Sequence, residues 1–319
     1  MLRVMAPGLQ SSLQARWRSG ARHLGLPAAG PADTLSMALA NRLVGNSPGE
    51  TAIEITYGGF EAIIESDCTI AITGAHGRIE VSGAEMPAHE SLHLRAGQSI
   101  TIAPPHFGAR AYLAIHSGFQ ATEFMGSAST DLTAGLGGHD GRALRAGDRL
   151  SAKGEARFQG DLQTPPALRP VFTEAFALRT CASAETGLLA PASRAALFGS
   201  AFTAGRQATR MGLALTGQSL RLASDGRMKS APVFPGTIQC PPSGTPILLL
   251  CDAQTTGGYP RIANIARCDR HLLGQIRPGN TVRLLERTPE AAAAAYTEKL
   301  DLLADWLQPG PEARGDILN

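Results

Sequence analysis

Apolar residues in the first third of the chain come in short runs that end at glycine or at a polar turn. Runs of this length are typical of strands rather than helices. The pattern predicts four early strands, at residues 2–5, 52–57, 69–73 and 78–81. Residues 92–102 also alternate between apolar and polar positions, so we expect strand there too.

Helical spacing of apolar residues occurs in three places. A predicted helix over residues 33–44 ends at Gly45-Asn46 and carries on one face Leu35, Ala38, Leu39 and Leu43. A short helix is expected over residues 193–202. The third predicted helix, residues 289–307, has Thr288 as its cap and proline at its first position, and its apolar stripe is Ala292, Tyr296, Leu300, Leu303 and Leu307.

The stretch over residues 246–266 joins two apolar runs through a polar loop. Residues 247–251 predict a strand that is buried on both faces, and residues 261–266 predict a second strand. The loop between them contains Gly257 and Gly258, for which we expect positive φ angles and a close approach to a ligand. A plain Gly-Gly hairpin with incidental polar neighbours is the alternative.

Composition favours a β-rich chain with many turns, because 36 glycines and 21 prolines occur in 319 residues. Residues 152–169 lose apolar periodicity and contain Thr164-Pro165-Pro166, which predicts a linker. The expected domains are a β-rich lobe at residues 1–163, a β-barrel lobe at 164–287, and a helix with a tail at 288–319. We expect the tail, residues 309–319, to be disordered.

The charge of the chain is low in amount and nearly balanced. Only 18% of residues are charged, below the usual share for a soluble domain, which suggests a surface covered by a protein partner. A net charge of +2 without a basic stripe argues against nucleic acid. No membrane-spanning or signal-like stretch is visible, and five scattered cysteines suit reduced thiols, so we expect a soluble, cytoplasmic protein.

His89-Glu90-Ser91-Leu92-His93 matches the HExxH zinc pattern by sequence alone. The pattern binds metal only on a helix, where residues four apart share one face. Here the surroundings predict strand, which would place the two histidines about 13 Å apart. We therefore expect surface histidines and no metal site.

Several polar residues are candidates for binding or catalysis. Amide, hydroxyl and guanidinium groups of the loop at 252–261 could orient a small anionic substrate: Gln254, Thr255, Tyr259 and Arg261. Arg210 could bind an anion or hold a loop in place. Glu54 lies between isoleucines in a predicted strand, so it either faces solvent or is a buried, paired carboxylate. A glycine-rich loop over residues 126–142 could form an anion nest, although its spacing matches neither the Walker nor the dinucleotide pattern.

The ten residues from Asp252 to Arg261, Asp-Ala-Gln-Thr-Thr-Gly-Gly-Tyr-Pro-Arg, resemble a block of one known family. It is the family of allophanate hydrolase subunit 2, the C-subunit of 5-oxoprolinase and biotin-dependent carboxyltransferases. We call residues 252–261 the hallmark loop. The resemblance extends over residues 8–285 and includes the segment 39–46. Within this segment, Asn41 and Arg42 are either functional residues or the solvated face of their helix. It also supports as candidates Ser127, Ser129, Thr130, Asp131 and Arg142.

The resemblance implies two linked β-rich, barrel-like lobes, one of them related to cyclophilin. It implies one component of an ATP-dependent 5-oxoprolinase, which opens 5-oxoproline to glutamate together with a paralogous B-subunit and a lactam-hydrolysing A-subunit. ATP is the implied cosubstrate of the complex. In this interpretation the hallmark loop orients the reacting group, while anion binding is assigned to Arg210, Gly257, Gly258, Ser129, Thr130, Asp131 and Glu54.

Two other functions are compatible with the same resemblance. One is the carboxyltransferase component of a biotin-dependent urea or amide carboxylase, with carboxybiotin as the carrier. The other is a regulatory protein, similar to the antagonist of a histidine-kinase inhibitor in sporulating bacteria. In this chain, polar residues of the family pattern are replaced at Ala15, at residues 182–184 and at Ala208. The loss of these polar groups suits the regulatory function as well.

Overall fold

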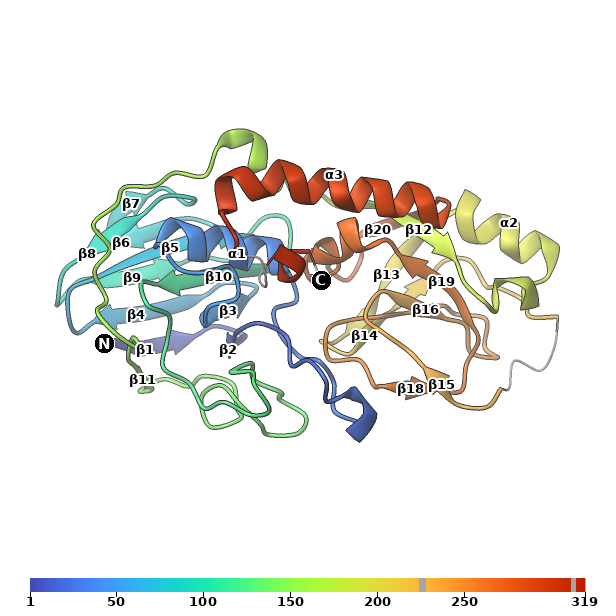
Figure 1. Cartoon of the computed structure of the whole chain (residues 1–319), viewed down its shortest axis with the longest axis horizontal. Coiled ribbons are helices and arrows are strands. Elements are labelled where there is room, and N and C mark those ends of the chain that lie inside the picture. Colours follow the sequence, from blue (N-terminus) through green and yellow to red (C-terminus); the bar gives the residue numbers. More distant parts are fainter. Residues whose placement is uncertain (224–227, 311–313, 319) are drawn as a thin grey trace. The chain divides into compact units, whose positions relative to one another are not determined.

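The computed structural model describes residues 1–223, 228–310 and 314–318, and these residues form two compact units (Figure 1). Unit 1 contains residues 1–19, 29–172 and 303–317, and unit 2 contains residues 20–28, 173–302 and 318–319. This division differs from the expected domain bounds in three ways, the first being that the boundary in the middle of the chain lies after Phe172 rather than after residue 163. Residues 20–28 pack with the later part of the chain, and the C-terminal helix is shared between the units.

Unit 1 is built on two antiparallel sheets. The six-stranded sheet has the order β11 (Arg149–Leu150), β1 (Leu2–Pro7), β4 (Phe60–Ile64), β9 (Ser99–Ile102), β6 (Ile79–Val81) and β7 (Ala84–Met86). The five-stranded sheet has the order β2 (Gln10–Gln14), β3 (Ala52–Thr56), β10 (Arg110–Ile115), β5 (Cys68–Gly74) and β8 (Leu92–Leu94). All of the strands expected between residues 2 and 102 are confirmed.

The core of unit 1 lies between its two sheets. Alternating residues of both sheets, such as Val4, Ile100, Ile55 and Leu113, are fully buried in one cluster. The other face of the five-stranded sheet is covered by helix α1 (Thr34–Leu43), whose Met37, Ala40 and Leu43 pack on Ala71 and Tyr112. The sheet is therefore covered on both faces, which explains why every residue of β3 and β5 is buried.

A buried carboxylate fixes the entry to helix α1. Glu54 is 2% exposed, and its Oε2 accepts hydrogen bonds from the Tyr112 hydroxyl at 2.7 Å and from the Ala32 N–H at 2.8 Å. The Tyr112 oxygen accepts in turn from the Asp33 N–H, and Asp33 caps the helix by accepting from the Ser36 N–H. Arg110 lies 3.3 Å from Glu54. Of the two interpretations of Glu54, the structure supports the buried, paired carboxylate.

Unit 2 is a closed barrel, so the β-barrel prediction is confirmed for this part of the chain. Its strands have the order β12 (Ala175–Ala182), β19 (Arg261–Ile265), β16 (Thr237–Gln239), β17 (Ile247–Leu249), β14 (Gly212–Thr216), β13 (Ala201–Ala208) and β20 (Thr281–Glu286). The parallel pair of β12 with β20 closes it. Inward residues such as Phe202, Ile238 and Leu248 fill the interior. A short two-stranded sheet lies beside the barrel: β15 (Ala231–Pro232) and β18 (Thr256–Gly257).

The remaining elements are helical. Helix α2 (Pro191–Gly199) starts two residues before the predicted helix and ends three residues earlier, so Phe202 belongs to β13. Helix α3 (Pro289–Leu307) confirms the third predicted helix, and the Ala291 N–H donates to the Thr288 hydroxyl as expected of a cap. The described part of the chain also contains five 3-10 segments: η1 (Arg22–Leu24), η2 (Pro166–Leu168), η3 (Thr186–Leu188), η4 (Arg267–Gln275) and η5 (Arg314–Asp316).

Two expectations about irregular segments are wrong. The predicted linker is bound to unit 1: the Thr69 N–H donates to the Ala156 carbonyl, and the Thr164 N–H donates to the His89 carbonyl. The prolines interrupt the apolar periodicity of this segment, but its backbone is still hydrogen-bonded to unit 1. In the predicted disordered tail, Ile317 and Leu318 are fully buried, while residues 311–313 and 319 lie outside the described residues. Among the helices of the described chain, none combines the length and the apolar character that crossing a bilayer requires.

Replacing Tyr112 by Phe should destabilise unit 1 by about 1–3 kcal/mol, because it removes the buried hydrogen bond that the hydroxyl donates to Glu54 and the one that it accepts from the Asp33 N–H. Urea unfolding of the full chain measures the change. Tyr296→Phe is the control, since this half-buried α3 ring packs on Arg267 through its face. Equal midpoints for Tyr112→Phe and wild type would contradict the role assigned to the hydroxyl.

Candidate functional site

The hallmark loop leaves the barrel after β17 and returns to it at β19. Within the loop, β18 pairs with β15, and the Val233 N–H donates to the Thr255 carbonyl at 3.0 Å. The run before the loop is buried as predicted, although the strand ends at Leu249 rather than at Cys251. The loop is therefore attached to the barrel at both ends and to a short sheet in its middle.

Gln239, at the end of β16, holds the hallmark loop through its side-chain amide. Its side-chain amide is buried, with 2% of the residue exposed. Nε2 donates to the Tyr259 carbonyl at 3.1 Å, and Oε1 accepts from Nε2 of Gln254 at 3.3 Å. One amide thus bonds to residues near the two ends of the loop. From the sequence, Gln239 stood out only as a neighbour of a Pro-Pro turn.

The two adjacent glycines have a different physical role from the one expected. Neither Gly257 nor Gly258 has a positive φ angle, so that prediction is wrong. A Cβ on Gly257 would lie 2.6 Å from Nε2 of Gln239, whereas a Cβ on Gly258 would come no closer than 3.3 Å to its surroundings. Glycine at 257 gives the Gln239 amide room to reach the loop.

The guanidinium of Arg261 is bound by an acid of its own unit. Nε and Nη2 donate to the two carboxylate oxygens of Glu185 at 2.8 and 2.5 Å, and Nη1 donates to the Pro232 carbonyl at 3.0 Å. The hydrogen bonds from Arg261 lower the pKa of Glu185. Glu185 directly follows the replaced segment 182–184, and sequence reasoning missed it. This geometry makes Arg261 a brace of the loop; direct contact with a substrate stays a prediction.

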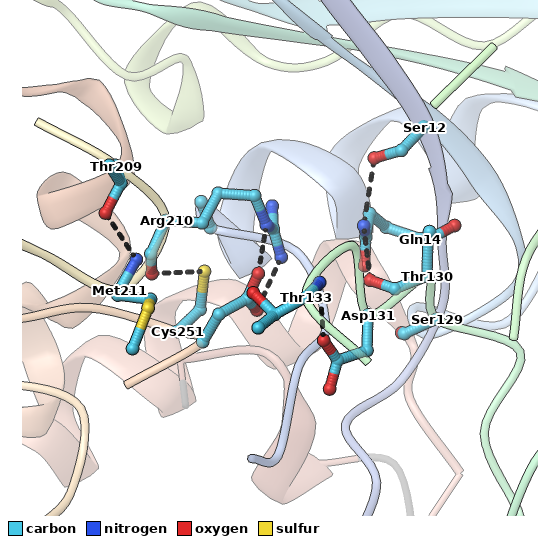
Figure 2. Close-up of polar contacts among 12 residues, drawn as sticks. Ser12, Gln14, Ser129, Thr130, Asp131, Thr133, Thr209, Arg210, Met211 and Cys251 are labelled. Atoms are coloured by element: carbon cyan, nitrogen blue, oxygen red, sulfur yellow. Dashed lines mark hydrogen bonds and ion pairs between the residues drawn. The ribbon is translucent and has the colours of Figure 1, made fainter. Parts of the chain in front are cut away.

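Arg210 makes a similar pair with the first residue of the hallmark loop. Its Nε and Nη2 donate to Asp252 at 2.7 and 3.0 Å, and both residues are 6% exposed. Figure 2 shows the Arg210 carbonyl accepting from the Cys251 thiol, and the Met211 N–H donating to Thr209. Of the two roles considered for Arg210, the contacts describe the one that holds a loop, and anion binding stays a prediction.

Residues 20–28 bring an unexpected arginine to the hallmark loop within unit 2. Arg22 donates to the Val233 carbonyl and, at 3.5 Å, to the Gln254 carbonyl. Its guanidinium also lies 5.1 Å from the centre of the Phe234 ring. Burial lowers its pKa. Beside these contacts, Phe234 is 51% exposed and Tyr259 is 45% exposed, so the loop presents aromatic surface to solvent.

The candidates in the glycine-rich loop belong to unit 1, where they hold the end of β2. Hydroxyls of this loop point inward: Ser129 donates to the Ala15 carbonyl at 2.7 Å, and Thr130 donates to the Leu13 carbonyl at 2.8 Å. Asp131 accepts from the Thr133 and Ala134 N–H groups. Figure 2 shows these residues together with Gln14, which donates to Ser12 and to the Thr130 carbonyl. These contacts make the loop rigid, and its ligand role stays a prediction.

Other polar candidates of unit 1 have partners within it. Arg142 forms a two-pronged ion pair with Asp148 and lowers the pKa of that acid to about 2. Asn41 is fully buried and donates to two carbonyls, so the solvated-face interpretation is wrong for it. Arg42 donates to the Trp306 carbonyl. Ser127 donates to the Arg16 carbonyl.

The HExxH segment is not helical, as expected from its surroundings. The expectation of a surface histidine is wrong for His89, which is buried outside any strand with a positive φ angle, and burial lowers its pKa to about 3. His93 lies in β8 and contacts Asp161 at 2.8 Å. Within residues 1–223, 228–310 and 314–318, no group of three or more histidine, cysteine or acidic side chains could hold a metal ion.

The structure separates the predicted site residues into two sets. Hallmark-loop candidates lie in unit 2 with Arg210, and their supports are Gln239, Glu185 and Arg22. Glu54 and the glycine-loop candidates lie in unit 1 and hold its own elements in place. The best-defined candidate site is therefore the hallmark loop, in which the buried Gln239 amide holds the Gln254 side chain and the Tyr259 backbone carbonyl.

Gly257→Ala should destabilise the protein by about 1–3 kcal/mol, because the added methyl group displaces a buried amide that is bonded at both ends. Gly258→Ala is the matched control and should cost less, since its contacts need only a small adjustment. Denaturant unfolding compares the two variants. A larger loss for Gly258→Ala would show that the close approach at Gly257 is not the constraint.

The Arg261–Glu185 pair should contribute stability that depends on pH. Because the folded-state pKa of Glu185 is lowered, its contribution is present above the ordinary glutamate pKa of 4.5 and is lost as the pH falls through the folded-state value. Glu185→Gln should lower the unfolding temperature at pH 7 by about 1–3 °C, and the difference from wild type should shrink in acid.

Glu286→Gln is the control for this measurement, since Glu286 pairs with Arg194 at a more exposed position of unit 2. Its difference from wild type should stay near zero at every pH. A Glu185→Gln difference that grows on acidification would have the wrong sign for this ion pair.

The chain is similar in sequence and fold to several known proteins. The chain is 35% identical over 303 residues to the C-subunit of 5-oxoprolinase from Escherichia coli (strain K12), a match covering 94% of this chain and 95% of that protein. It is 27% identical over 309 residues to urea amidolyase of Saccharomyces cerevisiae, covering 91% of this chain and 17% of that protein. The crystal structure of K. lactis urea amidolyase shares the fold, with a TM-score of 0.90 at 24% identity, covering 97% of this chain and 20% of that one.

The family model described as carboxyltransferase domain, subdomain A and B, matches residues 24–286. That range contains the complete barrel strands β12 to β20 and the whole hallmark loop with its supports Gln239 and Glu185. The match covers well over half of the chain, and the bacterial relative aligns along nearly its whole length. The chain is a member of the carboxyltransferase domain family, subdomains A and B.

Proposed function

We propose that the protein is the C-subunit of an ATP-dependent 5-oxoprolinase, which opens 5-oxoproline to glutamate. The observation that carries the proposal is the near full-length similarity to the C-subunit of the bacterial enzyme, together with a hallmark loop that is held through the Tyr259 carbonyl and the Arg261 side chain. The other components are a paralogous B-subunit and a lactam-hydrolysing A-subunit. The low charge of the chain is consistent with a surface made for such partners.

In this proposal the hallmark loop orients the cyclic amide. Gln254 and Thr255 offer hydrogen-bonding groups, and the exposed Tyr259 offers an aromatic face with a hydroxyl at its edge. Arg261 and Arg210 brace the loop through their ion pairs with Glu185 and Asp252. Fixed dipoles of this kind lower the barrier because they need no reorganisation during reaction.

ATP supplies the chemical activation of the amide in the complex. The glycine-rich loop fits phosphate poorly, because Ser129 and Thr130 direct their hydroxyls to carbonyls of the chain and not outward. We therefore assign no nucleotide contact to that loop. For this chain we propose binding and orientation of the substrate, and we place the ATP-dependent step in the assembled enzyme.

The test is co-expression of the chain with its two partner proteins and measurement of 5-oxoproline-dependent ATP hydrolysis and glutamate release. Arg261→Lys removes the two-pronged pair with Glu185 and should reduce kcat/KM on the order of tenfold. Arg194→Lys is the matched control, because it changes an exposed arginine that pairs with Glu286 in the same unit. Its turnover should equal that of wild type.

A second function is favoured by the urea amidolyase relative and by the family description: the carboxyltransferase of a biotin-dependent carboxylase. Biotin would then be the carrier of the carboxyl group. Transfer from carboxybiotin carrier protein to urea, without 5-oxoproline turnover, would favour this function over the first. A tight stoichiometric complex that turns over neither substrate would instead support the regulatory alternative.

A further inference from the structure

The hydrogen bonds around Gln239 have a defined direction. A backbone carbonyl can only accept, so the group of Gln239 that meets the Tyr259 carbonyl at 3.1 Å must be its nitrogen. The other end of the amide is then an oxygen, which also only accepts. Gln254 therefore has to present its own nitrogen to Gln239, at 3.3 Å. One fixed carbonyl sets the orientation of two side-chain amides in series.

The consequence concerns the far side of the Gln254 amide. With its nitrogen turned toward Gln239, its Oε1 is the atom left for a ligand, and within the described chain this oxygen has no hydrogen-bond partner. Gln254 is half-buried, while Gln239 is 2% exposed, so the fixed end of the pair is protected and the free end is accessible. A carbonyl-type oxygen in this position accepts a hydrogen bond and cannot donate one.

We propose that Gln239 is a positioning residue that makes Gln254 an acceptor, so that the hallmark loop selects ligands carrying an N–H beside their carbonyl group. The inference rests on the proposed function and makes it narrower: the loop reads the lactam N–H of 5-oxoproline. Urea carries the same N–H groups, so the selection also suits the second function. Gly257 belongs to the device, because a side chain there would push the Gln239 amide away.

An isosteric ligand without the N–H group can test this selection. The lactone 5-oxotetrahydrofuran-2-carboxylate has a ring oxygen in place of the lactam N–H and is otherwise the same shape. Its lone pair would face Oε1 of Gln254, which costs a hydrogen bond and adds repulsion. We expect the wild-type complex to bind 5-oxoproline on the order of tenfold more tightly than the lactone, measured as KM against the competitive inhibition constant.

Two variants of Gln239 separate orientation from simple support. Gln239→Met removes both hydrogen bonds, so Gln254 can rotate, and the preference for the lactam should fall to within about twofold. Gln239→Glu still accepts from Gln254, so it should keep the preference while losing the bond to the Tyr259 carbonyl. Thr237→Val is the control: it removes a buried hydrogen bond to Asn264 from the same strand, and its preference should equal that of wild type.

The outcomes distinguish this inference from the proposed function. A wild-type complex without 5-oxoproline-dependent turnover would overturn the proposed function and this inference with it. Turnover together with an unchanged lactam preference in Gln239→Met would overturn the inference alone. Equal loss of preference in Gln239→Met and Gln239→Glu would also overturn it, because a purely structural role affects both variants alike.

Discussion

The buried amide of Gln239 is the contact on which the candidate site depends. It lies at the end of a barrel strand, and it bonds to the loop near both of its ends. A closed barrel is a rigid support, since every strand is paired on both sides. The hallmark loop is thus held in a fixed geometry by a rigid barrel. Rigid support of this kind is what an orienting site requires.

Arginine–carboxylate pairs extend the same principle to the surroundings. In unit 2, Arg210 binds Asp252, Arg261 binds Glu185, and Arg179 binds Asp269 through two donors. The pairs of Arg261 and Arg179 join a strand to a non-strand segment, the Arg210 pair joins the β13–β14 bend to the hallmark loop, and each guanidinium has its carboxylate inside the same unit. The chain has few charged residues, and these six use their charge to hold segments of the chain together. Arginine suits this role because its planar fork matches a carboxylate.

Sequence reasoning worked where the signal was periodic and local. The predicted helix over 33–44 and the α3 stripe were visible because apolar residues recur at helical spacing, and Thr288 marked the start of α3, whereas the capping role of Asp33 was seen only in the structure. The barrel was expected from short strands and frequent turns. Glu54 was left between two interpretations because its partner Tyr112 lies 58 residues away, a separation at which no periodic pattern indicates a contact.

The site supports were missed for the same reason. Glu185 and Arg261 are 76 residues apart, and the sequence alone gives no sign that they meet. The glycine pair was misread because glycine serves two needs, positive φ and close approach, and only the fold shows which applies at Gly257. Proline-rich composition at 164–166 likewise indicated a linker, although backbone hydrogen bonds attach that segment to unit 1.

Neutron diffraction from a crystal of the full chain shows the orientation of both amides, because it separates nitrogen from oxygen in a side-chain amide. We expect deuterium on the Gln239 nitrogen directed at the Tyr259 carbonyl, and deuterium on the Gln254 nitrogen directed at Gln239. Gln254 found with its oxygen toward Gln239 and its nitrogen toward solvent would contradict this expectation.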